Sequence, residues 1–249
     1  MNNFFWLDFV PEERNVSYYM NWREEIATKI EFDNIKNLEE KEKVAKKITE
    51  KVENGQVIGF GSGSTSYVTV LEIAKKIKEE NIKIIAIPTS LEIKMLCAYL
   101  EIPTASLLEK KPDWSFDGAD EIDKNNWLLK GRGGAMFKEK LNIANSSITY
   151  ILADKSKKVE RLCTNYKVPV ECYTEGINYI KEELIKLGGS NIELRKAIGK
   201  DGPILTENNN VILDVKFETI THNLEREIKS IPGVIESGLF IDYNVEIIS

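Results

Sequence analysis

The 24 positions from 117 to 140 contain Asp117, Asp120, Lys130 and Glu139 around a glycine-rich loop. Asp117 and Asp120 lie three residues apart, Lys130 opens the glycine-rich loop, and Glu139 follows it. Carboxylates can take up and return protons, and a lysine fixed beside them can stabilise an oxyanion or a phosphate. The chain has a single histidine, so proton transfer here would fall to aspartate, glutamate or lysine. These residue types predict an enzyme that moves protons on a small anionic substrate.

A second glycine-rich turn lies upstream at residues 61–65, directly after the apolar run Val57–Phe60. Backbone N–H groups at the start of a helix, together with three hydroxyl groups, form a ready site for an anion. The turn is not a P-loop, because no Lys-Ser/Thr pair follows, and its glycines are too closely spaced for a dinucleotide fingerprint. The alternative is a tight strand-to-helix turn in which Ser64 or Thr65 only caps the helix.

Simpler interpretations of the charged segments stay open on the residues alone. Residues 117–121 could form a solvated acidic turn, whereas a calcium loop is excluded because the alternating oxygen ligands and the distant glutamate are missing. Residues 138–140, taken alone, predict a solvated charged face of a helix, and only the neighbouring glycine loop draws attention to Glu139. Lys157 follows an apolar run and could reach a phosphate or be solvated.

The elements that must position these groups alternate between short apolar runs and helical patterns. This alternation predicts a parallel sheet with helices on both faces, and it puts the polar motifs at strand ends, where open α/β sheets bind ligands. The predicted strands are Val57–Phe60, Ile82–Ile87, Trp114–Phe116, Trp127–Leu129 and Ile148–Leu152. The predicted helices are Leu38–Val52, Thr65–Ile77, Leu91–Leu100 and Ala135–Ala144.

After about residue 165 the order becomes strand, helix, two strands, helix, which predicts a small α+β domain of split-βαβ type. The run Gly238–Tyr243 is expected to return to the first sheet. The elements of the small domain are Val168–Val170, Gly176–Leu187, Ile192–Arg195, Val211–Val215 and Leu224–Ile231. The predicted division is an N-terminal extension, 1–36, with no assigned chemistry, a larger domain, 37–164 plus 237–249, and the small domain, 165–236.

Composition excludes several classes of protein. The formal net charge of −6 argues against a nucleic-acid partner, which favours a basic surface. No apolar stretch approaches the 18 or more residues of a membrane span, and the N-terminus lacks the basic segment of a secretory signal. The three cysteines lack metal-ligand spacing and read as reduced thiols. The expected location is the cytoplasm.

The motifs, in this order, resemble those of ribose-5-phosphate isomerase type A. The resemblance covers roughly residues 38–243. One position departs from it, because Arg132 stands where many members have glycine, and its side chain could clamp the substrate or point to solvent. The segments that carry the resemblance are 61–65, 117–121, 130–135 and 138–140, with the closing segments Ile231–Val234 and Gly238–Phe240.

This resemblance implies a fold and a reaction. The fold class is α/β, with a Rossmann-like, mostly parallel sheet domain and a smaller ferredoxin-like α+β domain. The reaction is the interconversion of D-ribose 5-phosphate and D-ribulose 5-phosphate in the non-oxidative pentose phosphate pathway, through an enediolate and without a metal or organic cofactor. A homodimer or homotetramer is implied, and a small sugar phosphate is the partner.

Carried over position by position, the resemblance implies that Glu139 is the general base. Asp117, Asp120 and Lys130 match the other catalytic residues. The positions that match substrate contacts come from every motif: Lys41, Ser62, Gly63, Ser64, Thr65, Asp117, Gly118, Ala119, Asp120, Lys130, Gly131, Arg132, Gly133 and Lys157.

Two other classes of protein compete with this reading. A sugar-phosphate sensor would keep the architecture without the chemistry, but such regulators usually carry a DNA-binding helix-turn-helix, and residues 1–36 are too acidic and poorly patterned for one. Acyl transfer from coenzyme A by a glutamate nucleophile would instead form a covalent thioester. The retained Glu139 and Lys130 favour the isomerase over the sensor.

Overall fold

The computed structural model describes residues 35–249 of the 249-residue chain. The extension predicted over residues 1–36 therefore lies outside the described residues, apart from Ile35 and Lys36. Within the described part, no helix is long and apolar enough to pass through a lipid bilayer.

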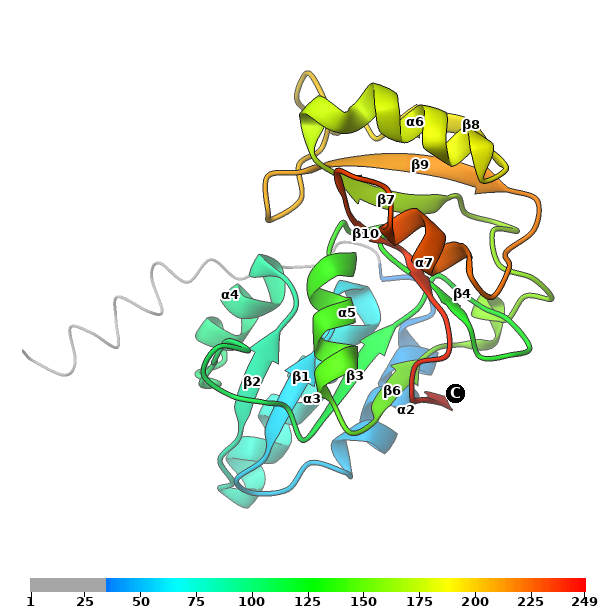
Figure 1. The fold of residues 1–249 in the computed structure, drawn as a ribbon. Helices are drawn as coiled ribbons and strands as arrows, with labels where there is room; N and C mark the ends of the chain where they lie inside the picture. The colour runs from blue at the N-terminus through cyan, green and yellow to red at the C-terminus, as the bar shows by residue number, and fades with distance from the viewer. Residues whose placement is uncertain (1–34) are drawn as a thin grey trace, which may run out of the picture.

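A five-stranded, fully parallel sheet forms the larger layer of the molecule (Figure 1). In spatial order its strands are β12 (Val245–Ile248), β6 (Thr149–Leu152), β3 (Trp114–Gly118), β1 (Val57–Phe60) and β2 (Ile85–Pro88). Phe60 at the end of β1 pairs with Pro88 on β2 and with Phe116 on β3. These three strands consequently end at the same edge of the sheet.

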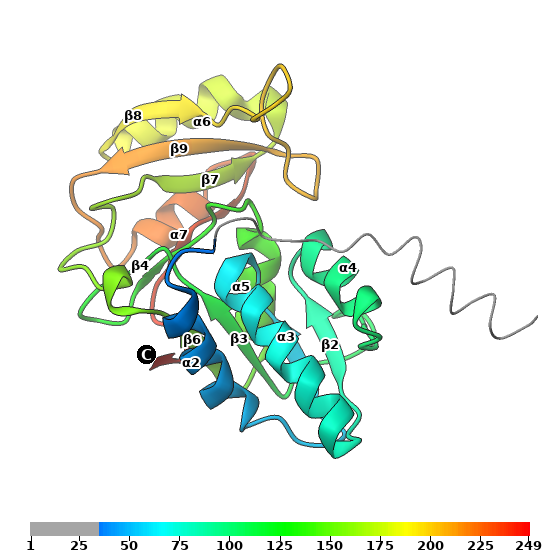
Figure 2. The same ribbon diagram turned by 180° about the vertical axis from the view of Figure 1, so that it is seen from behind.

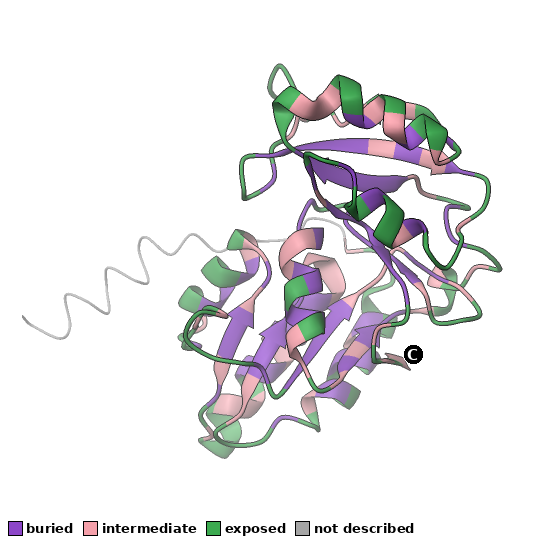
Figure 3. Ribbon diagram, viewed as in Figure 1, coloured by how far each residue is buried: buried purple, intermediate pink, exposed green. Residues whose placement is uncertain are grey.

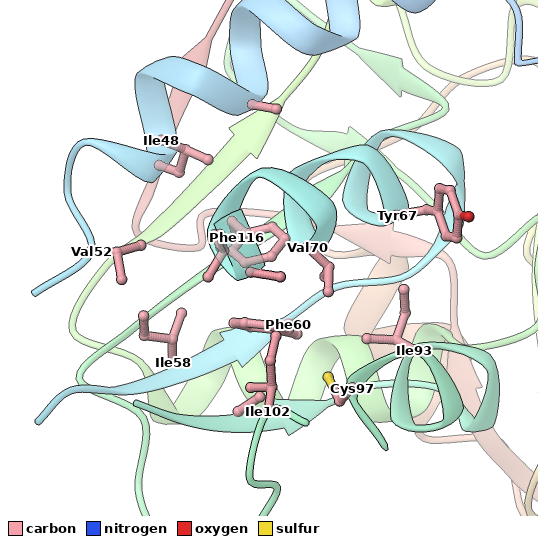
Figure 4. Close-up of a cluster of buried hydrophobic side chains, with 14 of the residues drawn as sticks. Ile48, Val52, Ile58, Phe60, Tyr67, Val70, Ile93, Cys97, Ile102 and Phe116 are labelled. Atoms are coloured by element: carbon pink, nitrogen blue, oxygen red, sulfur yellow. The ribbon is translucent and has the colours of Figure 1, made fainter. Parts of the chain in front are cut away.

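Helices cover both faces of this sheet, with α2 and α3 on one face (Figure 2) and α5 on the other (Figure 1). The helices are α2 (Leu38–Thr49), α3 (Gly63–Glu80), α4 (Leu91–Tyr99) and α5 (Met136–Asn145). Apolar side chains of α2, α3 and α4 pack with Ile58, Phe60 and Phe116, and the Phe60 and Phe116 ring centroids are 5.0 Å apart (Figure 4). Exposed residues lie on the outer faces of the helices (Figure 3). Burial of apolar surface therefore fixes the helices on the sheet.

A second, antiparallel sheet of four strands packs with two helices around its own apolar cluster. Its order is β10 (Val234–Ser237), β7 (Val168–Cys172), β9 (Val211–Phe217) and β8 (Gly189–Leu194), with α6 (Ile177–Lys186) and α7 (Leu224–Lys229). The chain order, β7-α6-β8-β9-α7-β10, confirms the split-βαβ pattern and adds β10, which the sequence did not predict. The boundaries of the domains at 164/165 and 236/237 stay a prediction.

A small three-stranded sheet corrects two sequence-based expectations. Its order is β11 (Leu239–Phe240), β5 (Leu128–Leu129) and β4 (Glu121–Ile122). The strand predicted at 127–129 therefore does not belong to the parallel sheet, and the run 238–243 does not return to it. Leu239 and Phe240 pair antiparallel with β5, and their side chains are buried in two apolar clusters. The strand that joins the parallel sheet is β12, beside β6.

Candidate active site

The candidate site lies at the carboxyl ends of β1 and β3. β1 pairs with β2 on one side and with β3 on the other. From β1 the chain runs through α3 to β2, and it must then pass β1 to reach β3. The connections leave β1 and β3 toward opposite sides of the sheet, and such a switch point is where open α/β sheets bind ligands.

The turn after β1 lies directly against Asp117 at the end of β3. A Cβ atom at Gly61 would come within 2.3 Å of the Asp117 carboxyl carbon, so only glycine fits there. The Gly61 N–H donates to the Phe116 carbonyl at 2.8 Å. Asp117 Oδ1 accepts hydrogen bonds from the backbone N–H groups of Ser62 at 3.2 Å and Gly118 at 2.7 Å. Asp117 therefore ties the turn to the strand end.

Lys130 lies between two carboxylates at the bottom of the site. Its Nζ is 3.0 Å from Asp117 Oδ2 and 3.4 Å from Glu139 Oε2, and it also donates to the Gly118 carbonyl. The Lys130 and Asp117 side chains are 3% exposed and that of Glu139 is 6% exposed. The backbone N–H of Lys130 donates to the Gly238 carbonyl at 2.9 Å. These contacts fix both ends of the lysine.

Burial changes the protonation of this group. Burial, followed by the negative charge of Asp117, raises the pKa of Glu139 to about 8 against the opposing attraction of Lys130. Burial also raises the pKa of Asp117, again against Lys130. For Lys130, burial disfavours the ammonium, but the charges of Asp117 and Glu139 prevail and raise its pKa to about 12. Glu139 Oε2 lies 3.4 Å from the Lys130 ammonium but makes no well-aligned hydrogen bond with any residue from 35 to 249. A carboxyl group in this state is a candidate proton acceptor.

The helix α5 carries Glu139 in its first turn, near the positive end of the helix dipole. Residues 138–140, taken alone, predict a solvated helix face, and this prediction is wrong for Glu139 and Lys140. Glu139 is buried in the site, and Lys140 is buried on its other side, whereas Lys138 is partly exposed and pairs with Glu207. The local charge pattern could not show this, because the covering elements come from elsewhere in the chain.

An open cavity of about 200 Å³ lies above Lys130 and Glu139. Every residue that the sequence assigned to the site lines this cavity except Asp117, which lies behind Lys130. The lining residues are Lys41, Ser62, Gly63, Ser64, Thr65, Gly118, Ala119, Asp120, Lys130, Gly131, Arg132, Gly133, Glu139 and Lys157.

One end of the cavity can bind an anion. The residues 63–65 begin α3, and Lys41 of α2 donates to Ser64 Oγ at 2.9 Å. Lys157 ends the short 3-10 helix η1 (Lys155–Lys157) that follows β6. Burial and then the positive charge of Lys157 lower the pKa of Lys41, although Asp154 opposes this. A phosphate bound at this helix N-terminus would offset the repulsion that Lys157 exerts on the Lys41 ammonium.

Asp120 and Arg132 form the rim of the cavity. Asp120 Oδ2 accepts a hydrogen bond from the Arg132 backbone N–H at 3.3 Å, and burial raises the pKa of Asp120. The Arg132 side chain is 59% exposed, 3.9 Å from Asp120 and 4.7 Å above the Tyr166 ring. It lies over an aromatic face, which is a favourable place for a guanidinium.

Several contacts of the site were not predicted from the sequence. Ser62 Oγ hydrogen-bonds with Thr89 Oγ1 at 2.7 Å. Arg195 donates to the carbonyl oxygens of Gly131 and Arg132, both at 2.9 Å. No local sequence pattern distinguishes Thr89 or Arg195, because their contacts join segments that meet only in the folded chain.

No group of three or more His, Cys, Asp or Glu residues in the described part of the chain is arranged to hold a metal ion. The one histidine, His222, is exposed and pairs with Asp242. The groups that line the cavity include carboxylates, ammonium groups, hydroxyl groups and glycine-rich backbone.

Comparison with known proteins agrees with this geometry. Residues 85–249 match the model of the family described as ribose 5-phosphate isomerase A (phosphoriboisomerase A). The ribose-5-phosphate isomerase A of Methanocaldococcus jannaschii is 40% identical over 201 residues, which are 80% of this chain and 88% of that protein. That of Pyrococcus horikoshii is 40% identical over 211 residues, 83% of this chain and 92% of that protein.

Solved structures agree as well. The structure of the Methanocaldococcus jannaschii isomerase superposes with a TM-score of 0.82 at 38% identity, covering 86% of this chain and 96% of that one. A D-ribose-5-phosphate isomerase in complex with phospho-erythronic acid superposes with a TM-score of 0.81 at 38% identity, covering 84% of this chain and 94% of that one. The chain therefore belongs to the ribose-5-phosphate isomerase A family.

Proposed function

We propose that the protein interconverts D-ribose 5-phosphate and D-ribulose 5-phosphate through an enediolate, with Glu139 as the general base. One observation carries this proposal: a buried carboxyl group with a raised pKa faces a cavity that also contains an anion-binding turn. An aldose–ketose isomerase needs these two features together, one to move a proton and one to hold the phosphate.

Glu139 would take the proton from C2 of the open-chain aldose and return it to C1, while the hydroxyl proton on O2 passes to O1. A base is most effective when its pKa is near the working pH, and a pKa of about 8 meets this condition far better than that of a solvated glutamate. Glu139 lines the cavity, so its carboxylate is accessible to the substrate proton. Burial therefore prepares Glu139 for its role.

Lys130 would stabilise the negative charge that develops on the substrate oxygens. Its raised pKa keeps it protonated throughout, so it acts as a fixed positive charge and not as an acid. Asp117 would hold this ammonium in place from behind, because it contacts Lys130 without lining the cavity. Asp120, at the rim, would orient the substrate hydroxyls and assist opening of the sugar ring.

The turn at 62–65, together with Lys41 and Lys157, would bind the 5-phosphate. Binding the phosphate at one end of a cavity holds C1 and C2 near the base, which converts binding energy into orientation. We also propose a cytoplasmic homodimer or homotetramer that needs neither a metal nor an organic cofactor and binds no nucleic acid. Sedimentation of the purified protein would measure its oligomeric state.

The decisive experiment is a coupled assay of ribose 5-phosphate conversion, with EDTA present, on the wild type and on Glu139→Gln. We expect turnover in EDTA for the wild type and a loss of at least about 10³-fold in kcat for the variant, within the range for a lost general base. Ribose 5-phosphate binding, measured by calorimetry, should change less than about threefold. Glu79→Gln, at an exposed position of α3, is the matched control.

Other outcomes would contradict parts of the proposal. Wild-type turnover by Glu139→Gln would exclude Glu139 as the base. Loss of wild-type activity in EDTA would contradict the metal-free reaction. Tight sugar-phosphate binding without any isomerisation would indicate a sensor, and a thioester trapped by hydroxylamine would indicate acyl transfer.

A further inference from the structure

Arg195 joins the four-stranded sheet to the loop that follows Lys130. It lies directly after β8, and its Nε and Nη2 both contact the carboxylate of Asp214 on β9, with Nε 2.8 Å from Oδ2. Its Nη1 donates to the carbonyl oxygens of Gly131 and Arg132, each at 2.9 Å. The Arg195 and Asp214 side chains are only 16% and 20% exposed. One guanidinium thus connects a carboxylate on the sheet to two successive peptide groups of the loop.

The orientation of these peptide groups has a consequence for the cavity. The described backbone has no cis peptide bond, so the N–H of each peptide group points away from its carbonyl. Because both carbonyls face Arg195, the N–H groups of Arg132 and Gly133 face the opposite side of the loop. There the Arg132 N–H reaches Asp120 Oδ2 at 3.3 Å, and both residues line the cavity.

The Gly133 N–H makes no hydrogen bond with any residue from 35 to 249. Two successive N–H groups that face the same space form a concave site for a negatively charged oxygen. Such donors stabilise charge in a transition state only when they are fixed beforehand. Gly131, at φ +98, gives the loop a backbone conformation that needs glycine, and it cannot by itself hold the orientation of the peptide groups that follow.

We propose that Arg195, held by Asp214, is a positioning residue that fixes the Arg132 and Gly133 N–H groups toward the substrate oxygens and Asp120. This inference rests on the proposed isomerase function. An arginine suits the task because its planar fork can satisfy a carboxylate and two carbonyls at once, which a lysine cannot. The loop 131–133 is then oriented by the four-stranded sheet, none of whose residues lines the cavity.

The test removes both members of the pair, because Arg195→Met alone leaves Asp214 buried and unpaired and would destabilise the protein for that reason. In Arg195→Met/Asp214→Leu we expect thermal stability close to that of the wild type. Its kcat should fall about tenfold to a hundredfold, below the roughly 10²–10³ that follows loss of a donor outright. The inhibition constant of inorganic phosphate should stay within about twofold, because the turn at 62–65 is untouched.

Three comparisons separate positioning from a structural role. The pH at which activity is lost on the acid side should not move, because the contacts of Glu139 are unchanged. Arg195→Lys should recover only part of kcat. Arg161→Met, a surface arginine paired with Glu218, is the control and should keep wild-type kcat. A folded double variant with kcat within twofold of the wild type would overturn the proposal.

A second readout does not depend on turnover. In ¹H–¹⁵N spectra, phospho-erythronic acid should shift the amide signals of Arg132 and Gly133 strongly in the wild type and much less in the double variant. Equal shifts in both proteins would overturn the positioning role. If the wild type failed to isomerise ribose 5-phosphate, the proposed function would fall, and the amide shifts would still decide for or against Arg195.

Discussion

Glu139 and Asp117 share one ammonium group in a place with almost no solvent. Two carboxylates beside a single lysine cannot both be fully compensated, and the raised pKa of each records the cost of ionising it. Asp117 has the better position, because two backbone N–H groups and Lys130 all favour its charged form. Glu139 has fewer partners that stabilise its ionised form, so its carboxylate accepts a proton more readily, as a general base requires.

The raised pKa of Glu139 predicts the pH dependence of the reaction. The base must be ionised, so kcat/KM should rise with pH and level off only above the Glu139 pKa of about 8, far from the usual value of 4.5. Steady-state kinetics between pH 5 and 9.5 would measure this rise in kcat/KM.

Asp117→Asn removes the nearby negative charge, so the residual activity of this variant should rise at a lower pH than that of the wild type. A rise in the wild-type kcat/KM near pH 4.5 would contradict this account of the site.

The same shift predicts a gain in stability on loss of the base. A carboxyl group whose pKa is higher in the folded protein stabilises it below the unfolded value of 4.5, and this contribution is lost as pH rises toward 8. Glu139→Gln cannot ionise, so its melting temperature relative to the wild type should be higher at pH 8.5 than at pH 5, by about 2–4 °C for each kcal/mol. Thermal unfolding at both pH values tests this, and exposed Glu79→Gln should show no such trend.

At the scale of secondary structure, the site depends on how closely β1 and β3 approach at their ends. Gly61→Ala would force a Cβ atom against the Asp117 carboxyl, and overpacking of this kind costs about 1–3 kcal/mol. We expect a melting temperature several degrees lower and a large loss of kcat, because Asp117 holds Lys130. Calorimetry would measure the first effect and the coupled assay the second.

The matched control is Gly118→Ala. A Cβ atom there meets nothing within 4 Å and the backbone conformation does not require glycine, so its melting temperature should stay within about 1 °C of the wild type. If both substitutions destabilised the protein equally, the contact with Asp117 would not be the reason that position 61 requires glycine.

Of the lysines of α2, Lys41 lines the cavity, and we expect it to bind the phosphate without taking part in the chemical step. Lys41→Met should raise KM for ribose 5-phosphate about tenfold with little change in kcat, because its contact with the phosphate would be equal in the ground and transition states. Lys43→Met, exposed on the same helix, is the control. A loss in kcat that matched the loss in kcat/KM would place Lys41 in the chemical step instead.

Much of the secondary structure could be predicted from the sequence. The strands β1, β3 and β6 and the helices between them follow from apolar runs and turns. The glycine-rich turn at 61–65 falls at the end of a strand of the parallel sheet as predicted, whereas the glycine loop after Lys130 follows β5 of the three-stranded sheet. The sequence could not identify strand partners, since β5, β11 and β12 are all short apolar runs. Nor could it show that Glu139 is buried or that Arg195 reaches the loop, because both depend on contacts between residues distant along the chain.

For the molecule as a whole, a buried lysine connects the parallel sheet to the rest of the fold. Lys140 on α5 donates to Glu236 at 2.8 Å and to the Ser237 and Leu239 carbonyls, and it lies 2.7 Å from Glu225. These partners belong to β10, β11 and α7. The lysine therefore joins the helix that carries the base to the four-stranded and three-stranded sheets.

Lys140→Met should destabilise the protein by about 3–5 kcal/mol, because the partly buried Glu225 would lose its cation and Glu236 would keep only Lys229, at 3.4 Å. With about 2–4 °C per kcal/mol, the melting temperature should fall by about 10 °C. Thermal unfolding of Lys138→Met, which removes only the surface pair with Glu207, should show a change of less than about 1 kcal/mol. Similar losses in both variants would contradict the role given to Lys140.

The hydrogen bond from Lys130 to Gly238 also bears on the order of events during synthesis. Lys130 follows β5, whose partner β11 lies more than a hundred positions later in the chain. A nascent chain that has been made only as far as β9 already contains all the proposed catalytic side chains, yet it lacks the strand that fixes the lysine. Contacts between distant residues form late in folding. Nascent chains that end before β11 should therefore be inactive, and activity should appear only after the chain has been made beyond Phe240.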